Sequence, residues 1–193
     1  MTLSNKPVVS TNEAIGVSDV LAPKSSFEVS LVDLTSLAGP EKSVNVFHFS
    51  RGYGALDPRE YSRVEASFLE ALKRLKHIGL DFPDEAVTIS RELFRNAFKH
   101  GTKNAFGGDV RLVQHESPTH FAYGILDGGD GIPQIDRLSL IDSTSPQLMP
   151  QIGGLHLNGH RRLKKALTDG IVEAIAFPND MKGIYILHKK HVR

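Results

Sequence analysis

Residues 91–101 read RELFRNAFKHG, a stretch in which apolar residues recur with the period of a helix. Its chemically versatile residues stand three or four positions apart: Glu92, Asn96, Lys99 and His100. Residues at these spacings share one side of a helix, so that Leu93 and Ala97 are left to face a core. The stretch therefore predicts an amphipathic helix with a polar side suited to binding or catalysis.

The patterns on either side of this helix predict the other elements. Strands are expected at residues 43–49, 110–113, 121–126, 171–177 and 183–188. Helices are expected from Asp57, with Pro58 at the first position, to about His77, from Pro83 to Gly101, and over 155–167. Runs of strands with helices grouped between them predict an α+β two-layer sandwich, in which a mixed, mostly antiparallel sheet is covered on one face by helices.

We expect two regions in the chain. Residues 1–42 form an N-terminal extension that is partly disordered or docks on a partner, with little order before residue 26. Within it, residues 26–33 alternate apolar and polar side chains, as a strand or a docked arm would. Residues 43–193 form the globular domain, where residues 132–150 lack periodicity and are expected to be a loop long enough to act as a lid.

Composition limits the function classes. The 193-residue chain carries a net charge of +1, so no overall field attracts nucleic acid or an anionic membrane. It contains no cysteine, which excludes disulfides, a Cys-zinc site and thiol catalysis. No signal peptide or membrane-spanning run is visible. We expect a cytoplasmic protein that recognises a protein partner locally, without direct contact to nucleic acid or membrane.

The polar side of the helix suits nucleotide chemistry. Asn96 offers a hard oxygen to Mg²⁺, and Glu92, one turn earlier, is placed to accept a proton from a hydroxyl or from water. Lys99 would lie near phosphate charge. By spacing alone, an ordinary solvated helix face explains the same pattern.

A second stretch, residues 124–133, reads GILDGGDGIP. An apolar strand ends at Asp127, whose carboxylate is suited to accept a hydrogen bond from an exocyclic amine such as that of adenine. Gly129 and Gly131 let the backbone approach a flat ring in conformations that other residues resist. A simple glycine-rich turn is the alternative, and a calcium loop is disfavoured because its acidic spacing and terminal Glu are absent.

A third stretch, residues 151–162, reads QIGGLHLNGHRR. The pair Gly153 and Gly154 precedes a predicted helix, whose free N-terminal amides and dipole favour a phosphate group. Glycine pairs before helices are common, so this signal by itself leaves a plain loop open as well.

Together the three stretches resemble the motifs of the Bergerat-fold ATPases, the superfamily of gyrase, Hsp90, histidine kinases and MutL. The pattern is most similar to that of the anti-sigma-factor serine/threonine kinases and covers about residues 43–190. The stretch from Glu92 to Gly101 resembles their N-box, and the stretch from Asp127 to Pro133 resembles their G1 box. The resemblance implies the histidine-kinase-like ATPase fold.

The resemblance also implies a role for each matching residue in a site for ATP and Mg²⁺. Asn96 would coordinate the metal, Asp127 would bind the adenine amine, and Glu92 would be the general base. The other cofactor-binding residues would be Lys99, His100, Gly129, Gly131, Ile132, Gly153, Gly154 and Leu155, with residues 132–152 as the lid. The partner would be a sigma-like or anti-anti-sigma-like regulator, and a homodimer is possible.

The third stretch departs from the family pattern. Ile152 and His156 occupy positions where the family has glycine. The leading hypothesis is an ATP-dependent protein kinase acting on serine or threonine. The alternative is a non-catalytic switch or adaptor of the same fold, with weak or lost turnover, that acts in signal transduction through protein contacts. A detached domain of a larger signalling kinase is a weaker third possibility, because no phosphoacceptor helix is evident.

Overall fold

The computed structural model describes residues 26–52, 54–101, 107–132, 134–141, 157–180 and 182–191. The helices are α1 (Leu31–Ala38), α2 (Pro58–Leu72), α3 (Pro83–Gly101), α4 (Gln134–Ile141) and α5 (Leu157–Thr168), with a 3₁₀ turn at Lys73–His77. The strands are β1 (Glu41–Phe49), β2 (Gly108–Glu116), β3 (His120–Asp127), β4 (Ala174–Ala176) and β5 (Gly183–Lys189).

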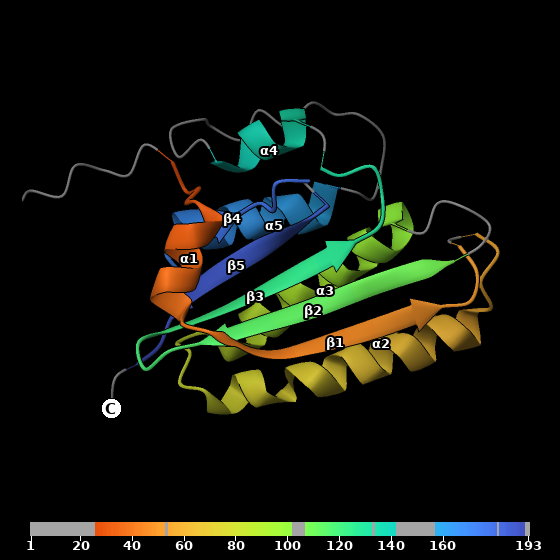
Figure 1. The fold of residues 1–193 in the computed structure, drawn as a ribbon, viewed down its shortest axis with the longest axis horizontal. Helices are drawn as coiled ribbons and strands as arrows, with labels where there is room; N and C mark the ends of the chain where they lie inside the picture. Colours follow the sequence, from red (N-terminus) through yellow and green to blue (C-terminus); the bar gives the residue numbers. More distant parts are fainter. Residues whose placement is uncertain are drawn as a thin grey trace, which may run out of the picture.

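The architecture is α+β, with a five-stranded sheet in the order β1-β2-β3-β5-β4 (Figure 1). Every pair of these strands is antiparallel. The prediction of a mixed sheet is therefore wrong for the five strands, and parallel pairing within the described residues is confined to an isolated bridge between Glu28 and Ile175. The predicted order of the main strands and helices is confirmed.

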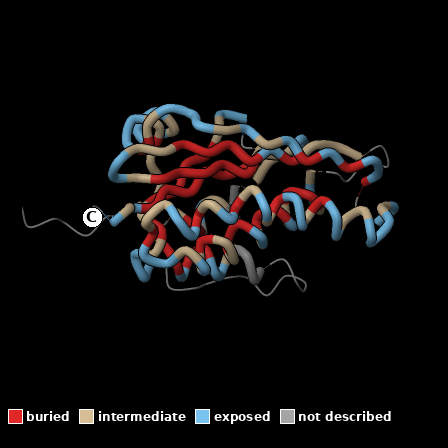
Figure 2. Tube along the Cα trace, turned by 90° about the horizontal axis from the view of Figure 1, so that it is seen from below, coloured by how far each residue is buried: buried red, intermediate tan, exposed pale blue. Residues whose placement is uncertain are grey.

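The principal core lies between one face of the sheet and the helices α2, α3 and α5. Aromatic rings fill its centre: Phe68 stacks on Phe94 with ring centroids 4.1 Å apart, and Phe49 stacks on Phe98 at 4.2 Å. Viewed with the sheet edge-on, the buried residues follow the strands and the inner sides of these helices (Figure 2). Burial of this apolar surface is the main driving force for the fold.

Helix α1 covers part of the opposite face, so the prediction that helices cover only one face is wrong. Leu34 and Ala38 of α1 are fully buried against a second apolar cluster that includes Tyr185 and Leu187 of β5. Beyond the reach of α1, Val44 and Val46 of β1 stay exposed on this face. The open part of the second face thus lies at the β1 edge of the sheet.

The strand expected over residues 26–33 is replaced by a short extended segment followed by α1. Ser30 caps this helix: its hydroxyl oxygen accepts a hydrogen bond from the Asp33 N–H at 3.0 Å and donates to the Asp33 carboxylate at 2.6 Å. This reciprocal cap was visible in the sequence as Ser-x-x-Asp, but the alternation of Phe27, Val29 and Leu31 suggested a strand instead.

The expected loop at residues 132–150 is also corrected, because it contains α4. Leu140 at the end of this helix is fully buried, and Ile141 packs against the principal core. A helix of eight residues spans only about two turns. Its apolar positions are therefore too few to show a clear period in the sequence.

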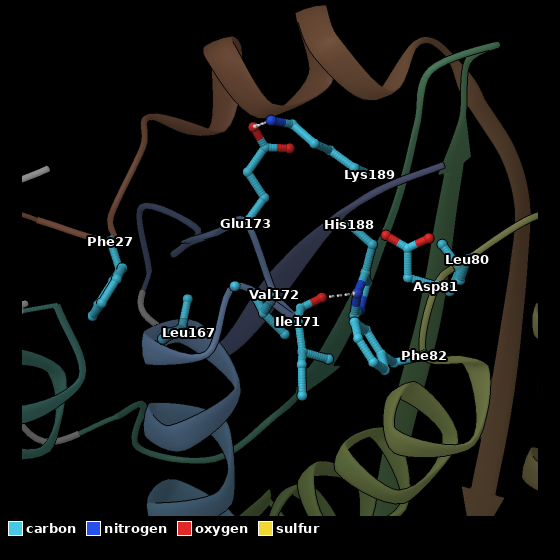
Figure 3. A pocket seen from close by; sticks show the side chains of 11 residues that line it. Phe27, Leu80, Asp81, Phe82, Leu167, Ile171, Val172, Glu173, His188 and Lys189 are labelled. Atoms are coloured by element: carbon cyan, nitrogen blue, oxygen red, sulfur yellow. Dashed lines mark hydrogen bonds and ion pairs between the residues drawn. The ribbon is translucent and has the colours of Figure 1, made fainter. Parts of the chain in front are cut away.

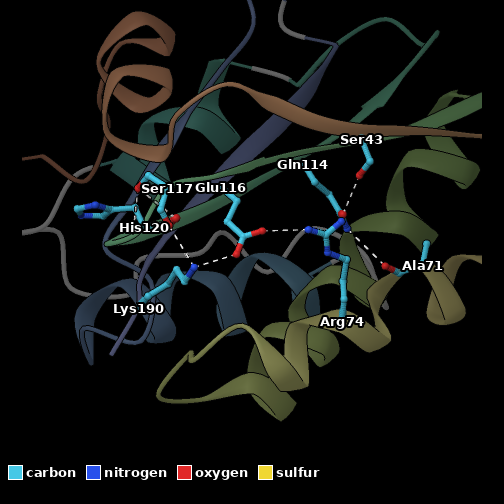
Figure 4. A network of polar contacts seen from close by, with 8 residues as sticks. All are labelled: Ser43, Ala71, Arg74, Gln114, Glu116, Ser117, His120 and Lys190. Carbon is cyan, nitrogen blue, oxygen red and sulfur yellow. Dashed lines mark hydrogen bonds and ion pairs between the residues drawn. The ribbon is translucent and has the colours of Figure 1, made fainter. Parts of the chain in front are cut away.

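A polar network fixes the end of the sheet opposite the predicted site (Figure 4). The Glu116 carboxylate at the end of β2 receives hydrogen bonds from Arg74 at 3.0 Å and from Lys190 at 2.8 Å. Lys190 also donates to the Ser117 carbonyl at 3.1 Å. This network joins the 3₁₀ turn after α2, the β2–β3 hairpin and the last described residues.

Candidate functional site

Helix α3 presents the predicted polar side as expected. Asp84 and Glu85 occupy its first turn and Lys99 and His100 its last, in the arrangement that complements the helix dipole. The buried side holds Ile89, Leu93, Phe94, Ala97 and Phe98. Glu92, Asn96 and Lys99 are consequently half-buried, whereas His100 is exposed.

Glu92 and Asn96 differ in the partners they have. An Arg95 guanidinium N–H donates to Glu92 Oε1 at 3.4 Å, a long hydrogen bond between residues three positions apart. Within the described residues, the Asn96 carboxamide has no hydrogen-bond partner. The helix therefore offers an uncommitted amide next to a carboxylate that is weakly paired with a cation.

The end of α3 touches the turn that follows β3. A Cβ atom at Gly101 would lie 2.5 Å from the Asp127 Cβ, so the absence of a side chain at Gly101 is what admits Asp127. A Cβ at Gly129 would lie 2.7 Å from the His100 carbonyl oxygen and 3.0 Å from the Gly101 Cα. The two stretches singled out in the sequence are thus in direct contact, through glycines on both sides.

The turn itself is held by Asp127. Its Oδ1 accepts a hydrogen bond from the Gly129 N–H at 2.8 Å, and its own N–H donates to the Lys182 carbonyl at 3.2 Å. Gly131 has φ 89°, a left-handed conformation that favours glycine. Gly129 and Gly131 are therefore required for different reasons: close approach to α3 at the first and backbone conformation at the second.

The electrostatics of Asp127 follow from its place between α3 and the sheet. Burial raises the pKa of the Asp127 carboxyl above its usual value. The Gly129 N–H and the positive charge of Lys182 lower this pKa, and the negative charges of Asp180 and Asp130 raise it. A hydrogen-bond donor from a ligand would stabilise the partly desolvated charged form.

A network that the sequence did not reveal joins α2 to α3 beside Glu92. Arg91 donates two hydrogen bonds to Glu65, from Nε at 3.0 Å and from Nη2 at 3.1 Å, and the Tyr61 hydroxyl donates to Glu65 at 3.2 Å. The hydrogen bonds from Arg91 lower the pKa of the Glu65 carboxyl. Such a pair fixes the helix turn that carries Glu92, but its partners are too far apart in sequence to be matched by pattern.

The remaining predicted residues divide into two groups. Ile132 is partly buried and packs against the principal core, directly after the Asp127 turn. Gly153, Gly154 and Leu155, the predicted phosphate-binding residues, lie outside the described part of the chain, together with Ile152 and His156. Of the predicted lid, residues 134–141 form α4, and the prediction for residues 142–152 falls outside the described residues.

Two cavities lie away from the polar side of α3. One of about 380 Å³ opens beside the Asp127 turn and is bordered by the charged residues Asp109, Arg111, Asp180 and Lys182. The other, of about 260 Å³, lies near the beginning of α3, beside Phe82 and His188 (Figure 3). The second cavity is at the opposite end of α3 from Gly101, so it does not belong to the site built by Asn96 and Asp127.

His188 beside the second cavity is a buried neutral histidine. Its Nδ1 lies 3.0 Å from the Ile171 carbonyl oxygen, and because a carbonyl only accepts, Nδ1 must carry the proton. Burial lowers the pKa of His188 to about 4. Its ring stacks on Tyr123 with centroids 5.7 Å apart. The residue is therefore a structural part of the core whose protonation would oppose folding.

No protein-family model matches the chain, and no curated protein has a significantly similar sequence. Over the described residues, no set of three or more His, Cys, Asp or Glu side chains is grouped to hold a metal ion. No helix in the described part of the chain combines the length and apolar character needed to cross a bilayer. The contact between α3 and the Asp127 turn is therefore the feature that points to a function.

Proposed function

We propose that the chain binds ATP with Mg²⁺ and acts as a protein serine/threonine kinase resembling the anti-sigma-factor kinases. The observation that carries the proposal is the contact of Gly101 with Asp127, which holds the polar side of α3 next to the glycine turn. We further propose that the fold is the histidine-kinase-like ATPase fold and that the protein acts in the cytoplasm on a protein partner.

Asp127 would bind the adenine amine. Its carboxylate is partly desolvated, so a ligand N–H would replace part of the lost hydration. Gly129 has no side chain and so lets the turn that carries Asp127 pack against α3, and Gly131 has a backbone conformation suited to glycine; the proposed role of both is to shape the turn that presents Asp127 to the ring.

Asn96 fits a role as a Mg²⁺ ligand. Mg²⁺ in nucleotide sites is typically held by one or two protein oxygens together with phosphates and water, so a cluster of acidic residues is not needed. The Asn96 oxygen has no hydrogen-bond partner among the described residues and is therefore free to serve. When bound, Mg-ATP supplies the phosphoryl group and neutralises part of its charge.

Glu92 would act as the general base. It would accept the proton of a serine or threonine hydroxyl on the partner as that oxygen bonds to the γ-phosphorus and ADP leaves. Arg95, which donates to Glu92 at 3.4 Å, would have to share or release the carboxylate for this step. Lys99, one turn after Arg95, would lie near the phosphates.

The first test is calorimetry with Mg-ATP. Wild-type protein should bind, Asp127→Asn should lose most of the affinity, and the matched variant Asp130→Asn in the same turn should keep it. Absence of binding by the wild-type protein, or equal affinity of the two variants, would contradict the nucleotide site.

The second test concerns turnover. With γ-labelled ATP and candidate partner proteins, label should pass to a partner serine or threonine, and Glu92→Gln should reduce the rate by about 10²–10⁴-fold with ATP affinity retained. Glu85→Gln, on the first turn of the same helix, should have no such effect. Transfer at the same rate by Glu92→Gln would exclude Glu92 as the base.

A non-catalytic switch of the same fold is the second candidate. It is favoured by Ile152 and His156, which stand where the related kinases have glycine. Such a protein would bind ATP in the calorimetric test but transfer no label to any partner. Substitution of Ile152 by Gly and of His156 by Gly should then raise ATP affinity or restore turnover, because backbone freedom at a phosphate loop would be regained.

A further inference from the structure

Residues 26–29 pair with the edge strand β4. The Val29 N–H donates to the Ile175 carbonyl at 2.9 Å, and the Ile175 N–H donates to the Phe27 carbonyl at 2.9 Å. These bonds form the parallel bridge between Glu28 and Ile175. On one side, therefore, the segment continues the sheet, and α1 follows it directly.

The other side of the same segment holds α4, and Figure 1 shows the two next to each other. The Phe27 N–H donates to the Ile141 carbonyl at 2.9 Å. The Glu28 carboxylate forms an ion pair with Arg137, and both side chains are mostly removed from solvent. Residues 26–29 thus contact α4 through the backbone and through a charged pair.

Lys164 of α5 completes the attachment. Its side chain is buried, its Nζ donates to the Leu140 carbonyl at 3.4 Å, and the same Nζ lies 5.1 Å from the centroid of the Phe27 ring. The last carbonyls of a helix have no partner within the helix. In α4, the carbonyls of Leu140 and Ile141 are instead bonded by Lys164 and Phe27, which belong to other elements.

These contacts, together with the burial of Leu140 in the principal core, hold α4 in place. A helix of eight residues is too short to be stable by its own hydrogen bonds. Its first residue, Gln134, follows Gly131 of the Asp127 turn after only Ile132 and Pro133. The chain therefore links α4 to the Asp127 turn through two residues.

We propose that residues 26–29 regulate the nucleotide site by holding α4 in place, so that release of this segment from α4 weakens ATP binding. The proposal rests on the proposed function for its nucleotide part. Because coupling between two sites is reciprocal, bound ATP must strengthen the attachment of residues 26–29 by the same factor.

The attachment is tested first without nucleotide, by hydrogen exchange of the full chain. Glu28→Gln should speed exchange of α4 amides by about ten-fold and leave β3 amides unchanged, because it removes one charged contact to α4. Glu70→Gln, which breaks a surface ion pair on α2, should leave α4 unchanged. The proposal is overturned if Glu28→Gln leaves the exchange of α4 amides unchanged, or if it speeds exchange equally in α4 and β3. It is also overturned if the α4 amides of the wild-type protein exchange as fast as those of an unstructured chain.

The coupling is tested next with Mg-ATP. Saturating ATP should slow exchange of the Phe27 and Val29 amides in the wild-type protein, and Glu28→Gln should weaken ATP binding several-fold. Equal ATP affinity of wild type and Glu28→Gln would overturn the coupling. If the wild-type protein binds no ATP, the proposed function fails and the regulatory part fails with it, whereas the exchange result without nucleotide still decides whether residues 26–29 hold α4.

Discussion

The buried histidine of β5 makes the stability of the fold depend on pH. His188 has a pKa of about 4 in the folded protein, compared with the ordinary value of 6.5 that it regains on unfolding. The unfolded chain therefore binds a proton in the pH range between these values and the folded chain does not. The contribution of His188 to the free energy of unfolding is greatest above pH 6.5 and falls as the pH is lowered toward 4.

The magnitude follows from the difference between the two pKa values. Complete titration would remove about 3 kcal/mol, and about 2 kcal/mol should already be lost at about pH 5. Replacing His188 with Phe keeps a ring against Tyr123 but removes the titrating group. The variant should therefore lose about 2 kcal/mol less than the wild type between about pH 7.5 and about pH 5.

Urea unfolding at the two pH values measures this difference. His77→Gln is the matched control, because it replaces a histidine that is exposed on the surface. If His188→Phe loses as much stability as the wild type between the two pH values, His188 is not the group that titrates on unfolding. If His188→Phe does not fold, NMR titration of the His188 ring in the wild-type protein decides instead, since a midpoint near the ordinary value is incompatible with a buried neutral ring.

The remaining predictions concern the glycine turn, α1 and the predicted adenine-binding residue. Gly129→Ala should lower the free energy of unfolding by about 1–3 kcal/mol because its Cβ would overlap α3. Gly128→Ala should change it by less than about 1 kcal/mol, because no atom lies within 4 Å of the added Cβ. Leu34→Ala should lower the free energy of unfolding by about 2–5 kcal/mol, and Leu37→Ala, at a partly exposed position, by less than about 1 kcal/mol. Urea unfolding measures all four variants. Similar urea midpoints for Gly129→Ala and Gly128→Ala, or for Leu34→Ala and Leu37→Ala, would contradict the packing described for these residues. ATP affinity, measured by calorimetry, should fall as the pH is lowered through the raised pKa of Asp127, because protonation removes the charge that strengthens the hydrogen bond to adenine. An ATP affinity that does not change with pH would count against Asp127 as the adenine-binding residue.

Long elements with a strong period were predictable. The span of α3 from Pro83 to Gly101 is confirmed, and so are the two strands expected at residues 110–113 and 121–126, because their apolar residues recur over many turns or strand positions. The cap of α2 is confirmed as well: Asp57 accepts a hydrogen bond from the Arg59 N–H at 2.9 Å. These features depend on contacts between residues that are close in sequence.

Short elements were missed where packing decides their conformation. Helices α1 and α4 have eight residues each, and their apolar side chains are too few to distinguish a helix from a strand or a loop. Both helices form because other parts of the chain bury Leu34 and Leu140. The prediction of helices on one face alone failed for the same reason, since α1 was not expected.

The placement of Glu92 and Asn96 on one side of a helix, and the glycine turn after a strand at Asp127, can be read from the residue pattern alone. The contact of Gly101 with Asp127, and the close fit of Gly129 against the His100 carbonyl, are visible only in the folded chain. Helical and strand periods follow from local backbone geometry, which a pattern records. The meeting of two distant segments depends on how the whole core packs, and close packing permits it here only where the side chain is a single hydrogen.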